Sequence, residues 1–217
     1  SLIKIKDIIS DNHKNDFNLF IGGDHSMSMA TISSKISDIK DNYAIVWIDA
    51  HTDCNTFETS PTNNVHGMSV SGLTGLLPGP YQKFKSISSK NIIYIGIRSI
   101  DKGENEILKK NESKVISMDD INNDFENKLE EINNFIKNKR IYITFDVDAL
   151  DPSLVSSTGT PVENGLNLHQ TNKIFDVLSN HNIISMDLVE FNPLIGNSES
   201  SYKNISNILI NFINKIN

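Results

Sequence analysis

Cysteine is almost absent from this sequence. Cys54 is the only one among 217 residues, so no disulfide can form within the chain. Small secreted domains commonly depend on disulfides, whereas proteins of the cytosol keep their thiols reduced. We therefore expect a cytoplasmic protein. The length of 217 residues is enough for a single domain with a substantial apolar core, spanning 1–217.

An excess of positive charge is also missing. The formal net charge is −7 and the isoelectric point is about 5.3. This balance argues against a partner that is nucleic acid or an anionic membrane surface. No apolar run approaches the roughly 18 residues of a membrane-spanning helix. The sequence thus favours an ordinary acidic globular protein that binds neither nucleic acid nor membrane.

Short apolar runs alternate with segments of helical spacing. The runs are continuous and rich in isoleucine, as expected for strands buried on both faces, and they cover 17–21, 43–48, 92–97, 114–118, 141–145 and 183–188. Between them, segments such as 125–136 and 205–216 place their apolar residues on one helical face. This alternation predicts an α/β domain with a mostly parallel sheet. Two long loops, 55–65 and 151–166, are of a length that is usually functional.

Acidic and histidine side chains follow several of these runs. His25 follows the first, Asp49, His51 and Asp53 follow the second, and Asp146 and Asp148 follow the fifth. In parallel sheets, ligands bind beyond the carboxyl ends of the strands, so these groups should meet on one rim. Four aspartates and two histidines would repel each other unless divalent cations neutralised them.

The ligand types indicate which ion would bind. Oxygen ligands mixed with imidazole nitrogen suit Mn²⁺ best, with Fe²⁺, Co²⁺ or Zn²⁺ as alternatives. Two ions about 3.5–4 Å apart need shared carboxylates. Asp49 and Asp146, each the first carboxylate of its cluster, are the natural bridges.

Each motif alone has an ordinary explanation. An Asp-x-His pair is usually a solvated loop, the segment 146–152 could be a turn capped by aspartates, and Gly22-Gly23 could be a tight turn. All three occur here in the order of an α/β chain. Coincidence is therefore improbable.

The motifs also resemble those of a known family. The segments Gly22-Gly23-Asp24-His25-Ser26, Asp49-Ala50-His51-Thr52-Asp53, His66-Gly67-Met68 and 145–152 are similar to those of the ureohydrolases, which include arginases and agmatinases. The resemblance runs from about residue 17 to 217 and is closest to arginases. It implies a three-layer α/β/α fold of the arginase/deacetylase type and two Mn²⁺ ions per chain. His25 and Asp53 would bind one ion, His51 and Asp148 the other, and Asp49 and Asp146 would bridge.

The resemblance further implies hydrolysis of the guanidinium group of L-arginine to L-ornithine and urea by a metal-bridging hydroxide. Such a hydroxide forms near neutral pH because a bound ion acidifies water. Glu190 would pair with the substrate cation, although it could instead cap a turn, and Thr160 would steady it. His66 would move a proton, as histidine does readily near neutral pH, unless it is structural. Asp53 is expected to take part in catalysis beside the ions.

An arginine enzyme must also hold the α-amino and α-carboxylate groups. By resemblance, Asp101 and Glu104 would hold the α-amino group, although acids also favour a helix start in general. A further set would bind the carboxylate side of the substrate: Asn55, Thr62, Asn64 and Gly67. Asn63, Ser69 and Ser99 depart from the residues usual in arginases, and Asn63 would alter the loop if its φ were positive.

These departures leave three functions open. The leading hypothesis is arginase. The first alternative is a ureohydrolase acting on agmatine, guanidinobutyrate or formiminoglutamate. The second is a catalytically silent, metal-stabilised homologue that binds a partner.

The start of the chain departs from the family as well. Relatives usually carry a further strand and helices before the Gly-Gly-Asp-His motif, so we expect the N-terminal edge of the sheet to be shortened. Either an N-terminal portion is missing from this chain, or a partner covers that edge. The resemblance implies a homo-oligomer, a trimer or a hexamer.

Overall fold

One parallel sheet organises the chain in the computed structural model, which describes residues 1–12, 17–36, 39 and 42–216. The strands are β1 (Asn18–Ile21), β2 (Tyr43–Ile48), β3 (Ile92–Ile97), β4 (Lys114–Ser117), β5 (Arg140–Asp146) and β6 (Asn182–Val189). They lie in the order β1-β6-β5-β2-β3-β4, and every neighbouring pair is parallel. The predicted parallel α/β sheet is confirmed.

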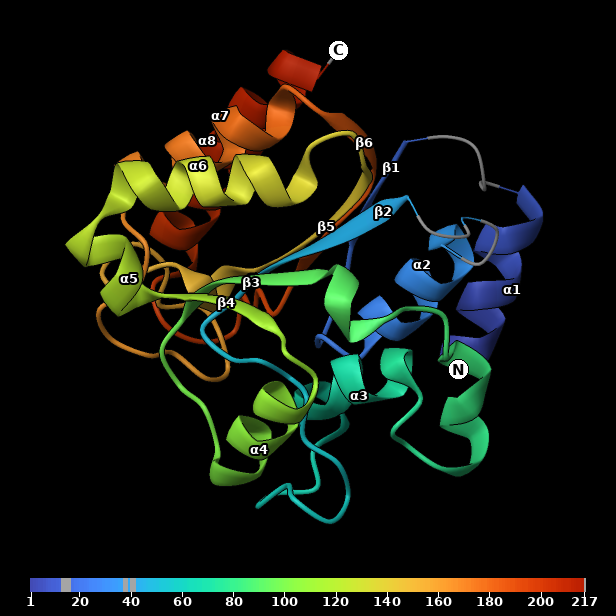
Figure 1. The fold of residues 1–217 in the computed structure, drawn as a ribbon. Coiled ribbons are helices and arrows are strands. Elements are labelled where there is room, and N and C mark those ends of the chain that lie inside the picture. The colour runs from blue at the N-terminus through green and yellow to red at the C-terminus, as the bar shows by residue number, and fades with distance from the viewer. Residues whose placement is uncertain (13–16, 37–38, 40–41, 217) are drawn as a thin grey trace.

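Helices cover both faces of the sheet, which gives three layers (Figure 1). One face carries α5 (Met118–Asn123), α6 (Phe125–Ile136), α7 (Leu168–Ser179) and α8 (Ser198–Ile216). The other face carries α1 (Leu2–Asn12), α2 (Met27–Ile36), α3 (Ser69–Thr74) and α4 (Lys102–Lys110). The predicted three-layer fold is therefore confirmed as well.

The side chains of β2 explain why both faces need cover. Ala44, Val46 and Ile48 point into one core, whereas Tyr43, Ile45 and Trp47 point into the other. Successive side chains of a strand face opposite sides, so a run that is apolar throughout needs an apolar layer on each side. The helices supply these layers with the one-sided apolar spacing read from the sequence, as in α6 and α8.

The register of the central strands brings the acidic motifs together. β2 and β5 are neighbours, and Ile48 pairs with Phe145. The next residues along the two strands are Asp49 and Asp146, so these carboxylates leave the sheet side by side. The third strand ends close by: Gly96 has φ of 90°, and a Cβ there would lie 3.3 Å from the carbonyl oxygen of Asp49. A glycine therefore allows β3 to approach the motif.

Within the described residues, no helix is long and apolar enough to cross a membrane. His13, a histidine outside every motif, lies outside the described residues.

Candidate metal centre and active site

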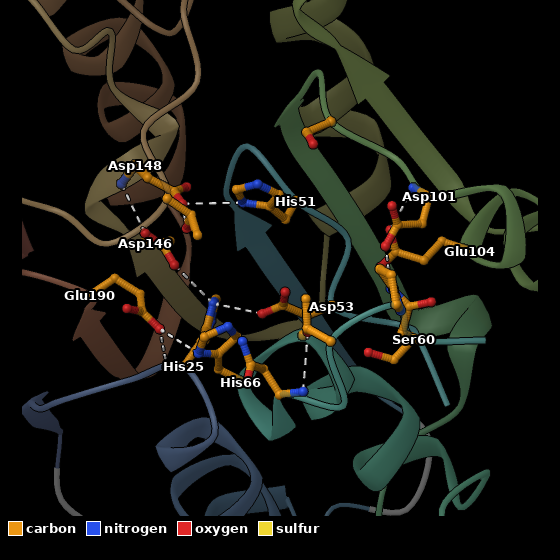
Figure 2. Close-up of a pocket in the computed structure, with 17 residues that line it drawn as sticks. His25, His51, Asp53, Ser60, His66, Asp101, Glu104, Asp146, Asp148 and Glu190 are labelled. Carbon is orange, nitrogen blue, oxygen red and sulfur yellow. Dashed lines mark hydrogen bonds and ion pairs between the residues drawn. The ribbon is translucent and has the colours of Figure 1, made fainter. Parts of the chain in front are cut away.

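Six side chains meet at the carboxyl ends of β1, β2 and β5, and we call them the rim cluster: His25, Asp49, His51, Asp53, Asp146 and Asp148. All of them except Asp49 line a cavity of about 280 Å³ (Figure 2). Asp49 is fully buried beneath the cavity floor. The structure thus brings the six residues predicted as metal ligands into one place.

His25 is the centre of one half of the cluster. Its Nδ1 lies 3.0 Å from a carboxylate oxygen of Asp49, 3.0 Å from one of Asp53 and 3.2 Å from one of Asp146. His51 is the centre of the other half. Its Nδ1 lies 3.1 Å from Asp148 and 3.5 Å from Asp49. Asp49 faces both histidines, as a bridging ligand must.

Backbone amides fix the carboxylates of the cluster. The amide of His51 donates to Asp49 at 2.7 Å, and the amide of Asp148 donates to Asp146 at 2.8 Å. The amide of Ala50 donates to Asp148 at 3.2 Å, across the gap between β2 and β5. Each contact ties a carboxylate to the loop that leaves a strand, so the geometry is set by the backbone and not by long side chains.

Burial dominates the electrostatics of the cluster. Burial and the charge of Asp49 raise the pKa of Asp53 to about 7, and burial with neighbouring carboxylates raises the pKa of Asp146 and of Asp148. Burial also works against ionised Asp49, but contacts with His25 and His51 outweigh it and lower the pKa of Asp49. The two histidines therefore do not supply enough positive charge to balance four neighbouring carboxylates, and a divalent cation would supply the rest.

The unsatisfied ring nitrogen of His25 tests whether a metal ion fits. Nδ1 is buried and makes no well-directed hydrogen bond, although three carboxylate oxygens surround it. Two overlapping groups of side chains have ligand atoms close enough to hold an ion: His25, Asp49 and Asp53 form one, and Asp49, His51 and Asp148 form the other. A nitrogen with two or more carboxylates in each group is a donor set that suits Mn²⁺ and related ions. The residues fit two divalent ions that share Asp49.

Trp47 is part of this centre and was missed by the sequence analysis. Its indole Nε1 donates to Asp49 at 2.9 Å, and its ring stacks on His25 with centroids 4.2 Å apart. A signal was available, because the only tryptophan lies two residues before Asp49 on β2 and therefore on the same side of the strand. Trp47 fixes the carboxylate of Asp49 and the plane of the His25 imidazole.

Glu190 and His66 lie at one side of the cavity (Figure 2). Glu190 Oε1 accepts from the backbone amide of His25 at 2.7 Å and lies 4.0 Å from Nδ1 of His66. Burial raises the pKa of Glu190. Glu190 was expected either to pair with the substrate cation or to cap a turn. Its carboxylate caps the turn after β1 and also faces the cavity, so its position is compatible with both roles. Its φ of 66° is rare outside glycine, as is the 48° of Asp53, and such strain is common at functional sites.

The expected partner of Thr160 needs correction. Its hydroxyl donates to Asp148 at 3.1 Å and does not bond to Glu190. Thr160 follows Asp148 by twelve residues on the loop that folds back over β5, so this carboxylate is the acceptor within its reach. Thr160 lines the cavity and supports the rim cluster directly.

The opposite side of the cavity is formed by two loops, 55–64 and 98–104, which we call the outer loops. Asn55 donates through its side-chain amide to Asp101 at 2.9 Å, and both residues line the cavity. Glu104 also lines it, but its two carboxylate oxygens accept from the amides of Cys54 and Asp101 at 3.1 and 2.9 Å. Burial raises the pKa of Glu104. Both carboxylate oxygens of Glu104 are thus used by backbone amides, and the bond from Asp101 caps the start of α4, as expected of an acidic residue at a helix start. Asp101 is therefore better placed than Glu104 to accept a hydrogen bond from a ligand.

The remaining residues predicted to bind substrate also line the cavity, namely Thr62 and Asn64 on the first outer loop and Gly67 just after it. Asn63 has φ of 60°, so the conformation that a glycine would favour is kept by the residue that tolerates it best after glycine. Ser60 lines the cavity too and was missed, because a serine in a loop carries no motif. Figure 2 places it beside Asp101 and Glu104, across from Asp146 and Asp148.

Arg98 connects the second outer loop to the rim cluster. Its guanidinium donates to backbone carbonyls on both sides of the long loop after β5, including those of Asp148 at 2.7 Å and Val162 at 2.7 Å. Gly165 makes this possible, since a Cβ there would lie 2.7 Å from the guanidinium. One half-buried cation thereby fixes the loop that carries Thr160 against the end of β5.

Comparison with known proteins places this site in a family context. The model of the arginase family matches residues 4–213. An arginase from Neurospora crassa is 40% identical over 191 residues, which cover 82% of this chain and 53% of that protein. A hepatic arginase from Aquarana catesbeiana is 39% identical over 207 residues, covering 90% of this chain and 64% of that protein. The chain thus spans between half and two thirds of the length of these relatives.

A solved structure agrees with the sequence relatives. The arginase of Entamoeba histolytica, determined in complex with L-ornithine, superposes with a TM-score of 0.88 at 32% identity. The match covers 97% of this chain and 74% of that one. The likeness therefore extends over nearly the whole of this chain.

Proposed function

This chain belongs to the arginase family, and from that membership we propose that it is part of a metal-dependent hydrolase that cleaves the guanidinium group of L-arginine to L-ornithine and urea. The observation that carries the proposal is the rim cluster, in which two histidines and four aspartates meet around two overlapping ligand groups. Two Mn²⁺ ions are the cofactors we propose. His25 and Asp53 would hold one, His51 and Asp148 the other, and Asp49 and Asp146 both.

The bound ions would supply a nucleophile from water near neutral pH and Lewis acidity toward the guanidinium. The side chains of this chain have the other tasks. Glu190 faces the cavity beside the cluster and would pair with the positive charge of the guanidinium. Pairing this cation in a partly buried site orients its carbon toward the ions.

His66 would handle the proton that the leaving amine needs. It lines the cavity 4.0 Å from Glu190, and its side chain is 35% exposed, so it can exchange protons with solvent. The metal site that we propose does not include His66, whose ion-pair contact is with Glu190. A group that shuttles protons needs this combination of access to the cavity and access to water.

The outer loops favour arginine over its decarboxylated analogue. An α-ammonium group would find the carboxylate of Asp101, and an α-carboxylate would find the amide of Asn55 and the hydroxyls of Ser60 and Thr62. Agmatine keeps the amino group but lacks the α-carboxylate, so it would leave the amide of Asn55 and the hydroxyls of Ser60 and Thr62 unpaired. Unpaired polar groups in a site cost binding free energy.

The test is hydrolysis with added Mn²⁺ of L-arginine, agmatine and guanidinobutyrate, followed by urea release, and of formiminoglutamate, followed by formamide release. We expect L-arginine to give the highest kcat/KM. A preference for agmatine would overturn the assignment of the substrate but keep the ureohydrolase chemistry. Tight binding of two ions without turnover of any guanidino compound would favour the silent, partner-binding homologue. A homo-oligomer and a cytoplasmic location remain proposals that follow from the family.

A further inference from the structure

A buried carboxylate lies beneath the rim cluster and outside the cavity. Asp187, on β6, is fully buried. It accepts hydrogen bonds from three hydroxyl groups: Tyr142 at 2.6 Å, Ser28 at 2.7 Å and Thr31 at 2.8 Å. Burying a carboxylate costs considerable free energy unless it is well satisfied. No task in the proposed reaction falls to this residue, so its presence needs another explanation.

A line of hydrogen bonds connects Asp187 to the rim cluster. Ser28 Oγ, which donates to Asp187, also lies 3.2 Å from Oγ1 of Thr144. Thr144 Oγ1 in turn lies 2.8 Å from Nε2 of His25. The line therefore runs from β6 through α2 and β5 to the imidazole whose other nitrogen, Nδ1, faces the three carboxylates. All of these side chains are buried.

The protonation state of Asp187 determines which group donates and which accepts in each hydrogen bond of this line. Burial raises the pKa of Asp187 to about 6, so the carboxyl is ionised at neutral and alkaline pH and can only accept. Ser28 must then give its single hydrogen to Asp187, and its oxygen is left to accept from Thr144. Thr144 has thereby given its own hydrogen away and can only accept from His25.

The consequence concerns the two ring nitrogens of His25. Nε2 must carry the hydrogen that Thr144 accepts, so Nδ1 is the nitrogen whose lone pair is available to an ion when the ring is neutral. Nδ1 is the nitrogen that makes no well-directed hydrogen bond and is surrounded by Asp49, Asp53 and Asp146. Trp47 stacks on the ring at an interplanar angle of 13° and fixes its plane, while the line of hydrogen bonds fixes its rotation within that plane.

We propose that Asp187 is a positioning residue that acts through Ser28 and Thr144 to hold His25 with its Nδ1 lone pair directed at one metal ion. The inference rests on the proposed function only in requiring that the rim cluster binds metal. Partners behind metal-ligating histidines are known to fix the ring and raise its basicity, and their loss typically weakens metal binding about 10- to 100-fold. The route here is indirect, with two hydroxyl groups between the carboxylate and the ring.

Two hydroxyl groups on the same oxygen of Asp187 provide a matched pair of variants. Ser28 and Thr31 both donate to Oδ2, but only Ser28 continues the line to His25. In Ser28→Ala, Thr144 loses its acceptor and can turn its hydrogen toward Nε2, which favours the hydrogen on Nδ1 and blocks the ligand. In Thr31→Val, Asp187 loses a hydrogen bond of the same kind while the line stays whole.

The experiment is a calorimetric titration of the metal-free chain with Mn²⁺. For Ser28→Ala we expect the Kd of one of the two ions to rise about 10- to 100-fold. For Thr31→Val we expect both constants to match the wild type. Equal constants in Ser28→Ala and wild type would overturn the inference, and so would equal weakening by the two variants, because that result would reflect packing alone. A wild-type chain that binds no ion would instead overturn the proposed function.

A spectroscopic readout separates positioning from stability. In the ¹⁵N-labelled, Zn²⁺-loaded chain, two-dimensional ¹H–¹⁵N spectra of the imidazoles distinguish a hydrogen on Nε2 from one on Nδ1. We expect His25 to carry it on Nε2 in the wild type and in Thr31→Val. Asp187→Asn, which puts a donor where only an acceptor stood, is the second variant if Ser28→Ala does not fold, and it should disturb this pattern. An unchanged His25 spectrum in a folded Asp187→Asn chain would contradict the inference.

Discussion

The rim cluster and the outer loops line the same cavity, but their side chains are held in different ways. The carboxylates of Asp49 and Asp146 leave the ends of adjacent parallel strands, and each is fixed by the amide two residues further along the chain. The outer loops are held by side chains from distant segments, such as Asn55 on Asp101 and Glu104 on the amide of Cys54. A site built on strand ends is thus set by the sheet, whereas a site built on loops depends on a few individual contacts. The difference suggests that the chemistry is robust and that the choice of substrate is easily changed.

The largest effect on activity is expected from removing a carboxylate of the rim cluster that we propose to bridge the two ions. In Asp146→Ala we expect the metal content to fall below two ions per chain. Urea release should drop at least about 1,000-fold, because loss of an ion removes several kcal/mol of transition-state stabilisation. Metal analysis and initial rates on L-arginine check both effects. Full activity with two ions bound would show that Asp146 is not a ligand.

His66 tests whether rate and metal binding can be separated within the cavity. In His66→Asn we expect both ions to remain, while turnover falls about 100- to 10,000-fold, the usual contribution of a proton-transfer group. The loss should be smaller for substrates whose leaving group needs less help from an acid. Loss of metal in this variant would place His66 in the metal site and contradict its separate role.

The outer loops should control selectivity without affecting the ions. In Asn55→Ala and Thr62→Ala we expect kcat/KM for L-arginine to fall about 10- to 100-fold, as one or two hydrogen bonds to the α-carboxylate are lost. The rate on agmatine should stay closer to that of the wild type, and Mn²⁺ binding should not change. An equal loss on the two substrates would mean that these loops support the fold of the cavity and not its choice of ligand.

Acidity should affect the rim cluster through metal binding. In the metal-free chain the pKa of Asp53 is raised to about 7 by burial and by the charge of Asp49. A proton on this carboxyl must leave before an ion can bind, so the metal-free state holds more protons and acid favours it. We therefore expect the apparent affinity for Mn²⁺ to rise about tenfold or more between pH 6 and pH 8. An affinity that is flat across this range would show that Asp53 is ionised without the ion.

Sequence patterns predicted the rim cluster because topology leaves little choice. An apolar run such as 43–48 must be a strand covered on both sides, and residues that follow parallel strands must emerge on one edge. This prediction did not require the order of the strands in the sheet. The structure then shows that β2 pairs with β5, which places Asp49 beside Asp146. The same periodicity predicted the parallel α/β sheet, and the family resemblance implied its three layers.

The loops could not be predicted in the same way. Thr160 was expected beside Glu190 but donates to Asp148, because the path of a long loop depends on contacts that the sequence does not display, such as those of Arg98 with Val162. Ser60 and Trp47 were missed for different reasons. A single loop serine has no pattern, and a tryptophan inside an apolar strand reads as core until its indole nitrogen is seen to reach Asp49.

The central claim is that the rim cluster holds two ions that share carboxylates. Electron paramagnetic resonance of the chain titrated with Mn²⁺ tests this most directly, because two ions bridged by the same ligands couple magnetically and two separate ions do not. We expect a coupled spectrum that is complete at two equivalents and is lost in Asp146→Ala. A spectrum of isolated ions at every ratio, or no bound Mn²⁺, would contradict it.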